Sequence, residues 1–399
     1  MPKPFQITHQ SKASRARVGR SRQRAGRLKT AHGIIETPVF MPVATQAVFK
    51  GGVDIIDAQN IKAPIILANT YHLYLRGAVP IIKKAGGLHK FMQWDKPILT
   101  DSGGFQVWSL GLGARKDQLC KIDDEGVNFT SHLDGKQHRL TPEKAVQIQL
   151  DLGADIIMAF DEATPDTASY DYTKRAMIRT HKWAERCFQI NSKLHVMPTW
   201  HGKTQNRQSQ LLFGIVQGGR FKKLRQESAR VIGSLGFDGI AIGGESIGYN
   251  MKRTGQILEY LAPYLPRDKP LYTMGVGASP LDFFKVVEHG ADMFDCVAPA
   301  RMARHGSLYS RQTGRKNNYR LNILNAKFKQ DFGPVCDWCD CAVCQNYSRA
   351  FLRHLFKSEE LTALRLASIH NLRFMLRVME EIRIAIKGGW FEKLQRQWL

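Results

Sequence analysis

ADIIMAFDE, residues 154–162, is the stretch that decides the fold. A short apolar run ends abruptly in two carboxylates, as expected of a buried strand whose carboxyl end opens onto a polar space. Seven other runs share this pattern of an apolar segment followed by a polar or glycine-rich cluster. They are PVFMPVAT (38–45), PIILANTYH (64–72), PILTDSGG (97–104), LFGIVQGG (212–219), FDGIAIGG (237–244), PLYTMGVG (270–277) and ADMFDCV (291–297).

Segments with helical periodicity separate several of these runs. In PEKAVQIQLDLG (142–153) and SPLDFFKVVEHG (279–290), apolar residues recur three and four positions apart, which is typical of a helix packed on a sheet. Eight such units between residues 38 and 297 fit an α/β fold, the (β/α)8 TIM barrel, in number and in length. A doubly wound sheet is the alternative, and the absence of G-x-G-x-x-G after the first strand disfavours it.

Polar and glycine residues stand at the carboxyl ends of the predicted strands. In a parallel barrel these ends open onto one face, where residues far apart in sequence converge. A carboxylate after an apolar strand is costly to bury unless it is paired or used, so several of them together predict a polar pocket. The residues at these ends are Asp101, Asp161, Gln217, Gly243, Gly244, Met274, Gly275 and Asp295.

The composition indicates a globular protein with a polyanionic partner. Of the 399 residues, 43% are hydrophobic and 23% charged, which is ordinary for globular proteins. No apolar run approaches the roughly 20 residues needed to span a bilayer, so no membrane partner is expected. The 58 Lys and Arg outnumber the 35 Asp and Glu, and a net charge of +23 favours RNA or DNA as a partner, with solubility alone as the alternative.

The chain divides into three predicted parts. A basic N-terminal segment covers residues 1–30, the barrel covers 31–306, and a zinc-binding subdomain with C-terminal helices covers 307–399. Within the first part, KASRARVGRSRQRAGRLK (12–29) carries no acidic residue. A transit peptide, a basic arm for nucleic acid and a solvated insertion all remain open for it.

The cysteines predict a structural zinc site and a reducing compartment, the cytoplasm. Cys339, Cys341 and Cys344 form a C-x-C-x2-C hook, which is a better metal site than a disulfide framework. The spacing leaves the fourth ligand open between Cys336, His354 and His370. A site with four protein ligands has no open position and is therefore structural.

A long helical region follows the hook, from about residue 346 to 387, with a break at 357–362. Its apolar positions predict a face that packs against the barrel. They include Phe351, Leu352, Leu355, Ile369, Leu372, Met375 and Met379.

Several long motifs, which occur in family order between about residues 27 and 385, identify a relationship. They are TDSGGFQV (100–107), MAFDE (158–162), GIVQGG (214–219), MGVG (274–277), DMFDCVAPARMARHG (292–306) and the cysteine hook followed by SIHNL (368–372). Together they resemble the tRNA-guanine transglycosylase (queuine tRNA-ribosyltransferase) family, in its bacterial-type catalytic form. The family exchanges the wobble guanine of G-U-N anticodon tRNAs for a 7-deazaguanine, queuine or its 7-aminomethyl precursor, by double displacement through a covalent tRNA–aspartate intermediate.

The resemblance also implies roles for individual residues. Asp295 matches the family's nucleophile and Asp101 its general acid and base. Asp161 matches the acceptor for the donor edge of the base, and the resemblance gives one structural Zn2+ per chain, tRNA as partner and a homodimer. The remaining matches are Gln217 and the Gly244 N–H to O6 of the base, Phe105 and Met274 on its two faces, Arg301 and Arg304 on the anticodon loop, and Cys339, Cys341, Cys344 and His370 on zinc.

The sequence departs from the family pattern at several places. Cys336 is an extra cysteine before the hook, and the basic insertion near residues 13–24 is unusual. Residues 245–249 read ESIGY where the family often reads Leu-Ala-Val-Gly-Glu, which leaves the register of that loop open. Ala163 replaces a common cysteine and slightly favours queuine. A non-catalytic tRNA-binding paralogue and an archaeosine-type transglycosylase are the alternative functions.

Overall fold

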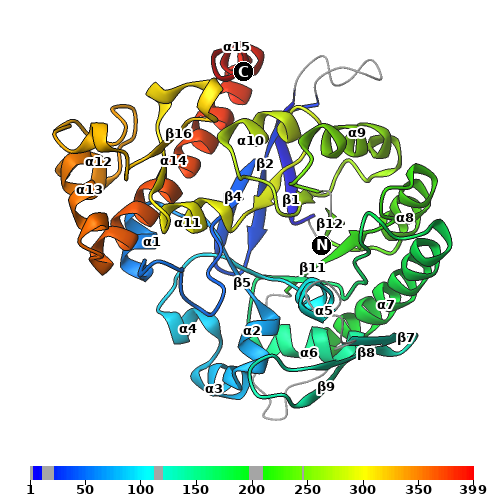
Figure 1. Cartoon of the computed structure of the whole chain (residues 1–399). Helices are drawn as coiled ribbons and strands as arrows, with labels where there is room; N and C mark the ends of the chain where they lie inside the picture. Colours follow the sequence, from blue (N-terminus) through cyan, green and yellow to red (C-terminus); the bar gives the residue numbers. More distant parts are fainter. Residues whose placement is uncertain (1–2, 11–21, 112–119, 197–209, 245–246) are drawn as a thin grey trace.

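The computed structural model describes residues 3–10, 22–111, 120–196, 210–244 and 247–399. Its centre is an eight-stranded parallel sheet in the order β4-β14-β13-β12-β11-β10-β6-β5 (Figure 1). A bridge between Val43 and Leu67 joins the two ends of this order and closes the barrel. The predicted (β/α)8 fold is therefore confirmed. The strands are β4 Val39–Met41, β5 Ile66–Ala68, β6 Ile98–Thr100, β10 Ile156–Met158, β11 Leu211–Val216, β12 Gly239–Ile242, β13 Leu271–Thr273 and β14 Met293–Asp295.

Helices surround the barrel, and the two predicted from periodicity are present with clear boundary signals. Thr141 caps the first turn of the helix over Pro142–Leu152, which ends at Gly153 in the left-handed region at φ 73°. Ser279 and Asp282 form a reciprocal capping box at the start of Pro280–Val287. The helices are α1 Ile55–Asn60, α2 Thr70–Leu75, α3 Ala78–Ala85, α4 Leu88–Met92, α5 Gly104–Gly111, α6 Pro142–Leu152, α7 Tyr170–Val196, α8 Lys222–Ser234, α9 Met251–Leu261 and α10 Pro280–Val287.

Two antiparallel sheets are added to the barrel, and the sequence patterns did not predict either. One is formed by β7 Cys120–Asp123, β8 Gly126–Thr130 and β9 Gln137–Leu140, between β6 and α6. The other is formed by β1 Phe5–Gln10, β2 Arg24–Thr30 and β3 Gly33–Thr37. Of the basic segment, β1 and β2 are thus ordered strands, whereas residues 11–21 lie outside the described residues.

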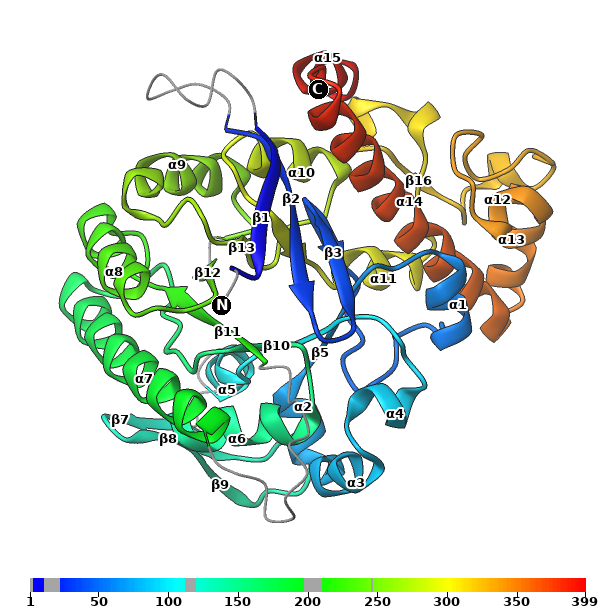
Figure 2. The same ribbon diagram turned by 180° about the vertical axis from the view of Figure 1, so that it is seen from behind.

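The N-terminal sheet covers the end of the barrel where the strands begin (Figure 2). Phe5, Leu28 and Ile35 of this sheet belong to the same buried cluster as the inward-facing barrel residues Ile156 and Phe213. The interior of this end of the barrel is therefore filled by apolar side chains, and the predicted polar strand ends lie at the opposite end.

An ion pair fixes the N-terminal sheet to the barrel. The Arg24 guanidinium bonds Asp292, which is fully buried, at 2.5 Å from Nη2 to Oδ2. The same guanidinium donates to the carbonyls of Arg267 (2.6 Å) and Lys269 (2.8 Å). Because both charged groups are buried, each depends on the other for its solvation.

The C-terminal part packs beside the barrel (Figure 1). α14 contains the predicted packing residues Leu372, Met375 and Met379, all buried. The predicted break is present between α13 and α14, but Phe351 was wrongly assigned to the packing face, since its side chain is 42% exposed. The elements are α11 Ala298–Ala303, β15 Ser307–Tyr309, β16 Arg320–Asn322, α12 Ala342–Asn346, α13 Arg349–Lys357, α14 Leu361–Lys387 and α15 Phe391–Trp398, with 3-10 turns at Ala262–Tyr264, Arg311–Thr313, Arg315–Asn317 and Ala326–Phe328.

None of the helices in the described residues is both long enough and apolar enough to cross a membrane.

Candidate active site and metal centre

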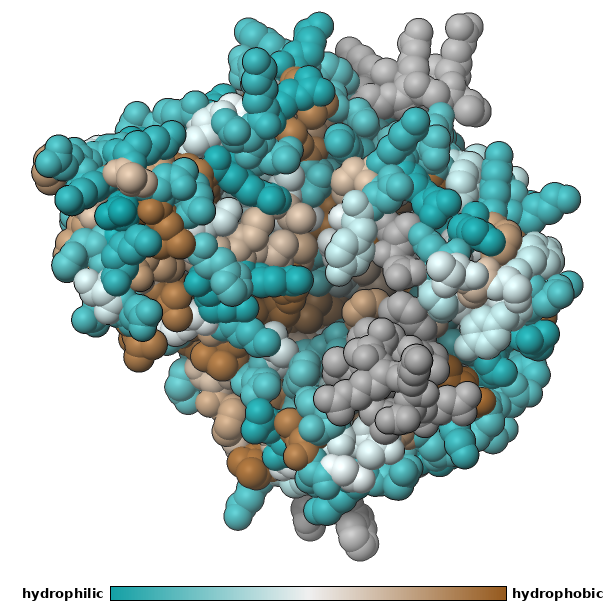
Figure 3. All heavy atoms as spheres, viewed as in Figure 1, coloured by the Kyte–Doolittle hydropathy of each residue, from teal (hydrophilic) through white to brown (hydrophobic). Residues whose placement is uncertain are grey.

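The carboxyl ends of the barrel strands form the face seen in Figure 1, and this face is hollowed near its centre (Figure 3). Strands β6, β10, β11 and β12 are consecutive neighbours in the barrel. Asp101, Asp161, Gln217 and Gly244 follow these four strands, while Asp295 ends β14, two strands beyond β12. The barrel thus brings the predicted polar strand ends to one face.

Asp101 is held by the start of α2. The Thr70 backbone N–H donates to Asp101 Oδ1 at 2.9 Å, and the Asn69 side-chain amide donates to Oδ2. Asn69 also caps α2, so a single residue fixes both the helix and the carboxyl group. Burial, together with the charge of Asp295, raises the pKa of Asp101 to about 7, against the hydrogen bond from Thr70.

Asp295 receives two hydrogen bonds on Oδ1. The Tyr272 hydroxyl donates at 2.6 Å and the Gly275 backbone N–H at 3.0 Å. Burial raises the pKa of Asp295, and these two donors oppose that shift by favouring the ionised form. Tyr272 is almost fully buried on β13, and sequence reasoning missed it because an inward-facing strand tyrosine reads as a core residue.

The charge of Asp295 contributes to the raised pKa of Asp101, although the strands that carry the two residues are not neighbours. Coulombic coupling of this kind requires that the two carboxyl groups face a common, poorly screened space. Two carboxyl groups with raised pKa values at the carboxyl ends of barrel strands are suited to nucleophilic and acid–base work.

Asp161 and Gln217 form a buried pair on neighbouring strand ends. Gln217 Nε2 donates to Asp161 Oδ2 at 2.7 Å, and the Ser102 hydroxyl lies 3.3 Å from Asp161 Oδ1. Burial raises the pKa of Asp161 to about 6, although these hydrogen bonds lower it. The pair offers a carboxylate acceptor beside an amide, a combination that recognises a flat base with both donors and acceptors on its edge.

Glycines let the backbone approach this pair closely. A Cβ at Gly104 would lie 2.7 Å from the Asp161 carbonyl oxygen, and one at Gly243 would lie 2.7 Å from Gln217 Nε2. A side chain at either position would displace the polar pair. This steric constraint explains why glycine pairs accompany the strand-end carboxylates.

The remaining predicted site residues lie around this face. Phe105, on the first turn of α5, is 46% exposed, and Met274 is partly buried against the barrel interior. Arg301 is exposed on α11, and Arg304, whose pKa is lowered by burial and by Arg301, follows that helix. The loop register at 245–249 stays open because residues 245–246 lie outside the described residues.

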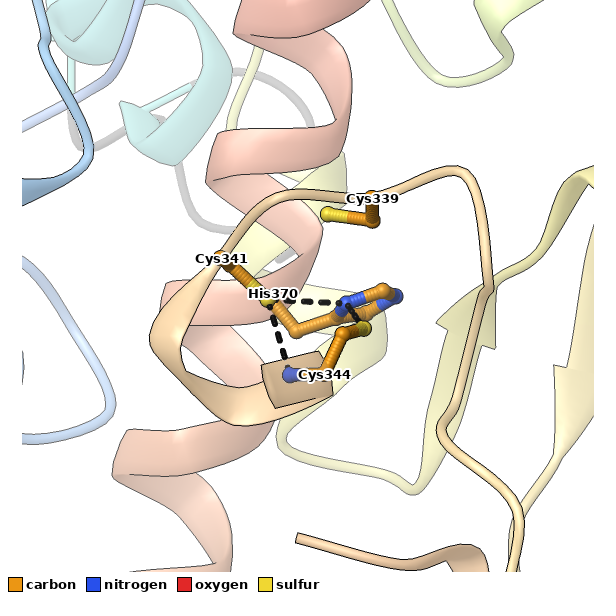
Figure 4. A group of neighbouring side chains, drawn as sticks. All are labelled: Cys339, Cys341, Cys344 and His370. Atoms are coloured by element: carbon orange, nitrogen blue, oxygen red, sulfur yellow. Dashed lines mark hydrogen bonds between the residues drawn. The ribbon is translucent and has the colours of Figure 1, made fainter. Parts of the chain in front are cut away.

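Cys339, Cys341, Cys344 and His370 converge in the C-terminal part (Figure 4). Their ligand atoms all lie within 4.8 Å of one another, and His370 Nδ1 is 3.5 Å from Cys341 Sγ and 3.3 Å from Cys344 Sγ. His370 Nε2 lies 2.7 Å from the Tyr309 carbonyl oxygen, which fixes the tautomer that leaves Nδ1 as the metal ligand. Three thiolates and one imidazole fit a closed tetrahedral zinc site.

The other two candidate ligands are directed elsewhere. The Arg311 backbone N–H donates to Cys336 Sγ at 3.4 Å, and Cys336 is not part of the cluster. His354 is exposed on α13. The chain turns between α13 and α14, and α14 returns His370 to the cysteine hook. The tertiary structure therefore identifies the fourth ligand, which the spacing left open.

A second cluster, of His32, His89 and Asp155, lies where the N-terminal sheet meets the barrel. The two imidazoles stack with centroids 3.5 Å apart and planes 13° apart, and each ring bonds one oxygen of Asp155. A metal in the plane of one ring would lie far from the plane of the other. The cluster therefore connects the β2–β3 turn to the barrel through Asp155, and it is not interpreted as a metal centre.

Fold and site together define a (β/α)8-barrel enzyme with paired carboxyl groups at its carboxyl-end face and a Cys3His metal-binding subdomain. A sequence model of the queuine tRNA-ribosyltransferase family matches residues 20–399. The chain belongs to this family, the tRNA-guanine transglycosylases, which are pentosyltransferases.

Curated relatives agree over nearly the whole chain. The queuine tRNA-ribosyltransferase of Halothermothrix orenii is 49% identical over 96% of this chain and 93% of its own length. Those of Herpetosiphon aurantiacus and Caldanaerobacter subterraneus are each 50% identical, over 94% and 95% of this chain and 89% and 94% of their own lengths.

Removal of the histidine ligand tests the metal centre. His370→Ala is expected to lose bound zinc and to lower the melting temperature, because three thiolates then lack their fourth partner. Cys336→Ser and His354→Ala are the matched controls and are expected to keep about one zinc per chain in elemental analysis. Zinc loss in either control with retention in His370→Ala would contradict the assignment.

Proposed function

We propose that this chain exchanges the wobble guanine of G-U-N anticodon tRNAs for a 7-deazaguanine, queuine or its 7-aminomethyl precursor, through a covalent tRNA–Asp295 intermediate. The observation that supports the proposal is the placement of Asp101 and Asp295 at the carboxyl ends of barrel strands, on the face that also holds the hydrogen-bonded Asp161–Gln217 pair. One space thus has a group to hold the sugar, a group to move a proton, and a polar pair to read a base.

The reaction proceeds by two displacements at one ribose carbon. A carboxylate oxygen of Asp295 forms a bond to C1′ as the C1′–N9 bond breaks, and the departing guanine takes its bonding electrons and a proton from Asp101. The incoming base then gives its N9 proton to Asp101, and N9 displaces Asp295 from C1′. Asp101 suits this double role because a pKa of about 7 populates both protonation states near neutrality.

Asp295 is prepared for nucleophilic attack by its two donors. The hydrogen bonds from Tyr272 and Gly275 occupy Oδ1 and stabilise the carboxylate against the effect of burial. The Tyr272 hydroxyl can follow the change in charge on Asp295 as the covalent bond forms and breaks.

Base recognition follows from the donors and acceptors around the pair. Ionised Asp161 accepts from the N1–H and 2-amino groups of the base, while Gln217 and the Gly244 N–H donate to O6. Phe105 and Met274 contact the two faces of the ring. Ala163, two residues after Asp161, is buried. Its side chain leaves more room for the 7-substituent of the base than a cysteine would.

The tRNA is bound by cations near the nucleophile. Arg301 and Arg304 lie six and nine residues after Asp295 on and just after α11, where they reach phosphates and unstacked bases of the anticodon loop. The net charge of +23 supports attraction of a polyanion to the whole chain.

The Cys3His cluster holds one structural Zn2+. The metal, when bound, supplies cross-linking of the hook to α14 and no chemistry at the sugar, because four protein ligands fill its coordination sphere. Thiolate ligands, together with seven cysteines that form no disulfide, support a reducing compartment, for which we propose the cytoplasm.

An exposed aromatic surface on the zinc subdomain supports a homodimer. Phe332, Tyr347, Phe351 and Leu361 are between 38% and 81% exposed, and the rings of Tyr347 and Phe351 stack with centroids 5.5 Å apart. Hydrophobic side chains gather over α12 and α13 on the left of Figure 3. Apolar patches of this kind are costly in water, and we propose that a second copy of the chain covers this one.

Replacement of the nucleophile tests the mechanism. Asp295→Ala is expected to reduce incorporation of radiolabelled guanine into a G-U-N tRNA by ~10³-fold or more, because no covalent intermediate can form. Its tRNA affinity is expected to stay within about threefold of wild type, since the binding cations remain. Asp268→Ala, an exposed acid paired with Lys3 outside the site, is the control and should retain activity. Wild-type exchange by Asp295→Ala would contradict the assignment.

A charge placed on the aromatic surface tests the dimer. Phe351→Glu is expected to convert a sedimenting dimer into a monomer, because a carboxylate would be buried in the apolar contact. Ile384→Glu changes an apolar residue that is more exposed than Phe351 and lies about 35 Å from Leu361 along α14, at 1.5 Å per residue, and this variant should remain dimeric. A monomeric wild type, or an unaltered Phe351→Glu dimer, would contradict the proposal.

A further inference from the structure

Arg225 is a fully buried cation on α8 for which the described residues show no ion pair within salt-bridge distance. Asp166, whose charge acts on it, is bonded to Arg253 at 2.9 Å. Burial accordingly lowers the pKa of Arg225 below its usual value. A buried guanidinium without a carboxylate partner is destabilising on its own, so its hydrogen bonds need an explanation.

Those hydrogen bonds join two neighbouring strand ends. Arg225 Nε donates to the Gly219 carbonyl at 2.5 Å, and Nη1 donates to the Gly243 carbonyl at 3.0 Å. Gly219 follows β11 and Gly243 follows β12, which pair in parallel. One side chain therefore connects the two backbone turns that carry Gln217 and Gly244.

The bond to the Gly243 carbonyl also fixes the direction of the next amide. The Gly243–Gly244 peptide is trans, since among the described residues the cis peptide bond is the one between Thr37 and Pro38. In a planar trans peptide the C=O and N–H groups point in opposite directions. With its carbonyl turned to Arg225, this peptide directs the Gly244 N–H away from the Arg225 guanidinium, and Gly244 itself is partly exposed.

A pair of glycines does not hold a peptide in one orientation by itself, since neither residue restricts its own dihedral angles. Gly244 has φ +123°, and a Cβ there would lie 2.4 Å from Arg225 Nη2. The guanidinium thus packs directly against Gly244, and Nη2 has no hydrogen-bond partner among the residues that the structure describes. Its position is set by the two carbonyls and by contact with this turn.

We propose that Arg225 is a positioning residue that orients the Gly244 N–H toward the base and thereby selects bases with a carbonyl oxygen at C6. This inference rests on the proposed function, because it presumes that a purine-like base occupies the site. Rotation of the Gly243–Gly244 peptide would present a carbonyl where the base carries O6, and two acceptors would then repel each other.

The test compares Arg225→Met with Arg24→Met, using guanine and 2-aminopurine as probes. Arg24 is the matched control: it is also buried and bonds two backbone carbonyls, but at the opposite end of the barrel. Inhibition constants for both bases are measured against tRNA exchange, together with the melting temperature of each variant. Arg225→Lys keeps the positive charge but cannot donate to both carbonyls in the geometry of a guanidinium. It replaces Arg225→Met in the experiment if the methionine variant does not fold.

Arg225→Met is expected to weaken guanine binding about tenfold, the worth of one hydrogen bond to a neutral acceptor, and to raise KM for the base more than it lowers kcat. 2-Aminopurine has no O6, so its inhibition constant should change less than twofold. Arg24→Met should lose stability without changing either constant.

Two results would overturn the inference. Unchanged guanine binding in a folded Arg225 variant would remove the positioning role, and equal weakening of both bases would reduce Arg225 to a structural residue. Failure of the wild type to bind guanine at all would instead contradict the proposed function.

Discussion

The repulsion between Asp101 and Asp295 is the constraint on which the active face depends. Asp295 raises the pKa of Asp101, and two like charges of this kind are stable at one site only if the surrounding fold holds both carboxyl groups in place. The barrel does so by independent means: the start of α2 binds Asp101, and β13 with the following turn binds Asp295. Neither carboxyl group relies on the other for its position.

The two ends of the barrel have different roles: one stabilises the fold, and the other carries the residues proposed for the reaction. At one end the N-terminal sheet fills the interior with apolar side chains, and charged groups such as Arg24 and Asp292 are fully paired. At the other end the Asp161 carboxyl group is buried and those of Asp101 and Asp295 are partly buried, glycines replace side chains, and the buried Arg225 has a donor without a partner among the described residues. Polar groups with incomplete hydrogen bonding thus lie on the face where a ligand is proposed. This is expected where the requirements of function oppose those of stability.

The sequence was sufficient for the features that depend on local pattern. The eight apolar runs became the eight barrel strands, and Asp101, Asp161 and Asp295 lie at their carboxyl ends because parallel strands leave no other arrangement. The cysteine hook predicted a metal site for the same reason: short spacing alone brings three thiols together.

Features that depend on contacts across the fold were not predictable in this way. The selection of His370 over His354 depends on how α14 returns to the hook, and the exposure of Phe351 depends on which side of α13 faces the barrel. Tyr272 and Arg225 act through hydrogen bonds to other strands, and no local pattern distinguishes such residues from ordinary core and surface positions.

The central claim is that Asp101 and Asp295 share one site, and carbon-13 NMR titration of the Asp101 carboxyl group tests it most directly. The account predicts a pKa near 7 for Asp101 in the wild type and a clearly lower pKa in Asp295→Asn, because that isosteric change removes the neighbouring negative charge. An Asp101 pKa that is the same in both proteins would contradict a shared site.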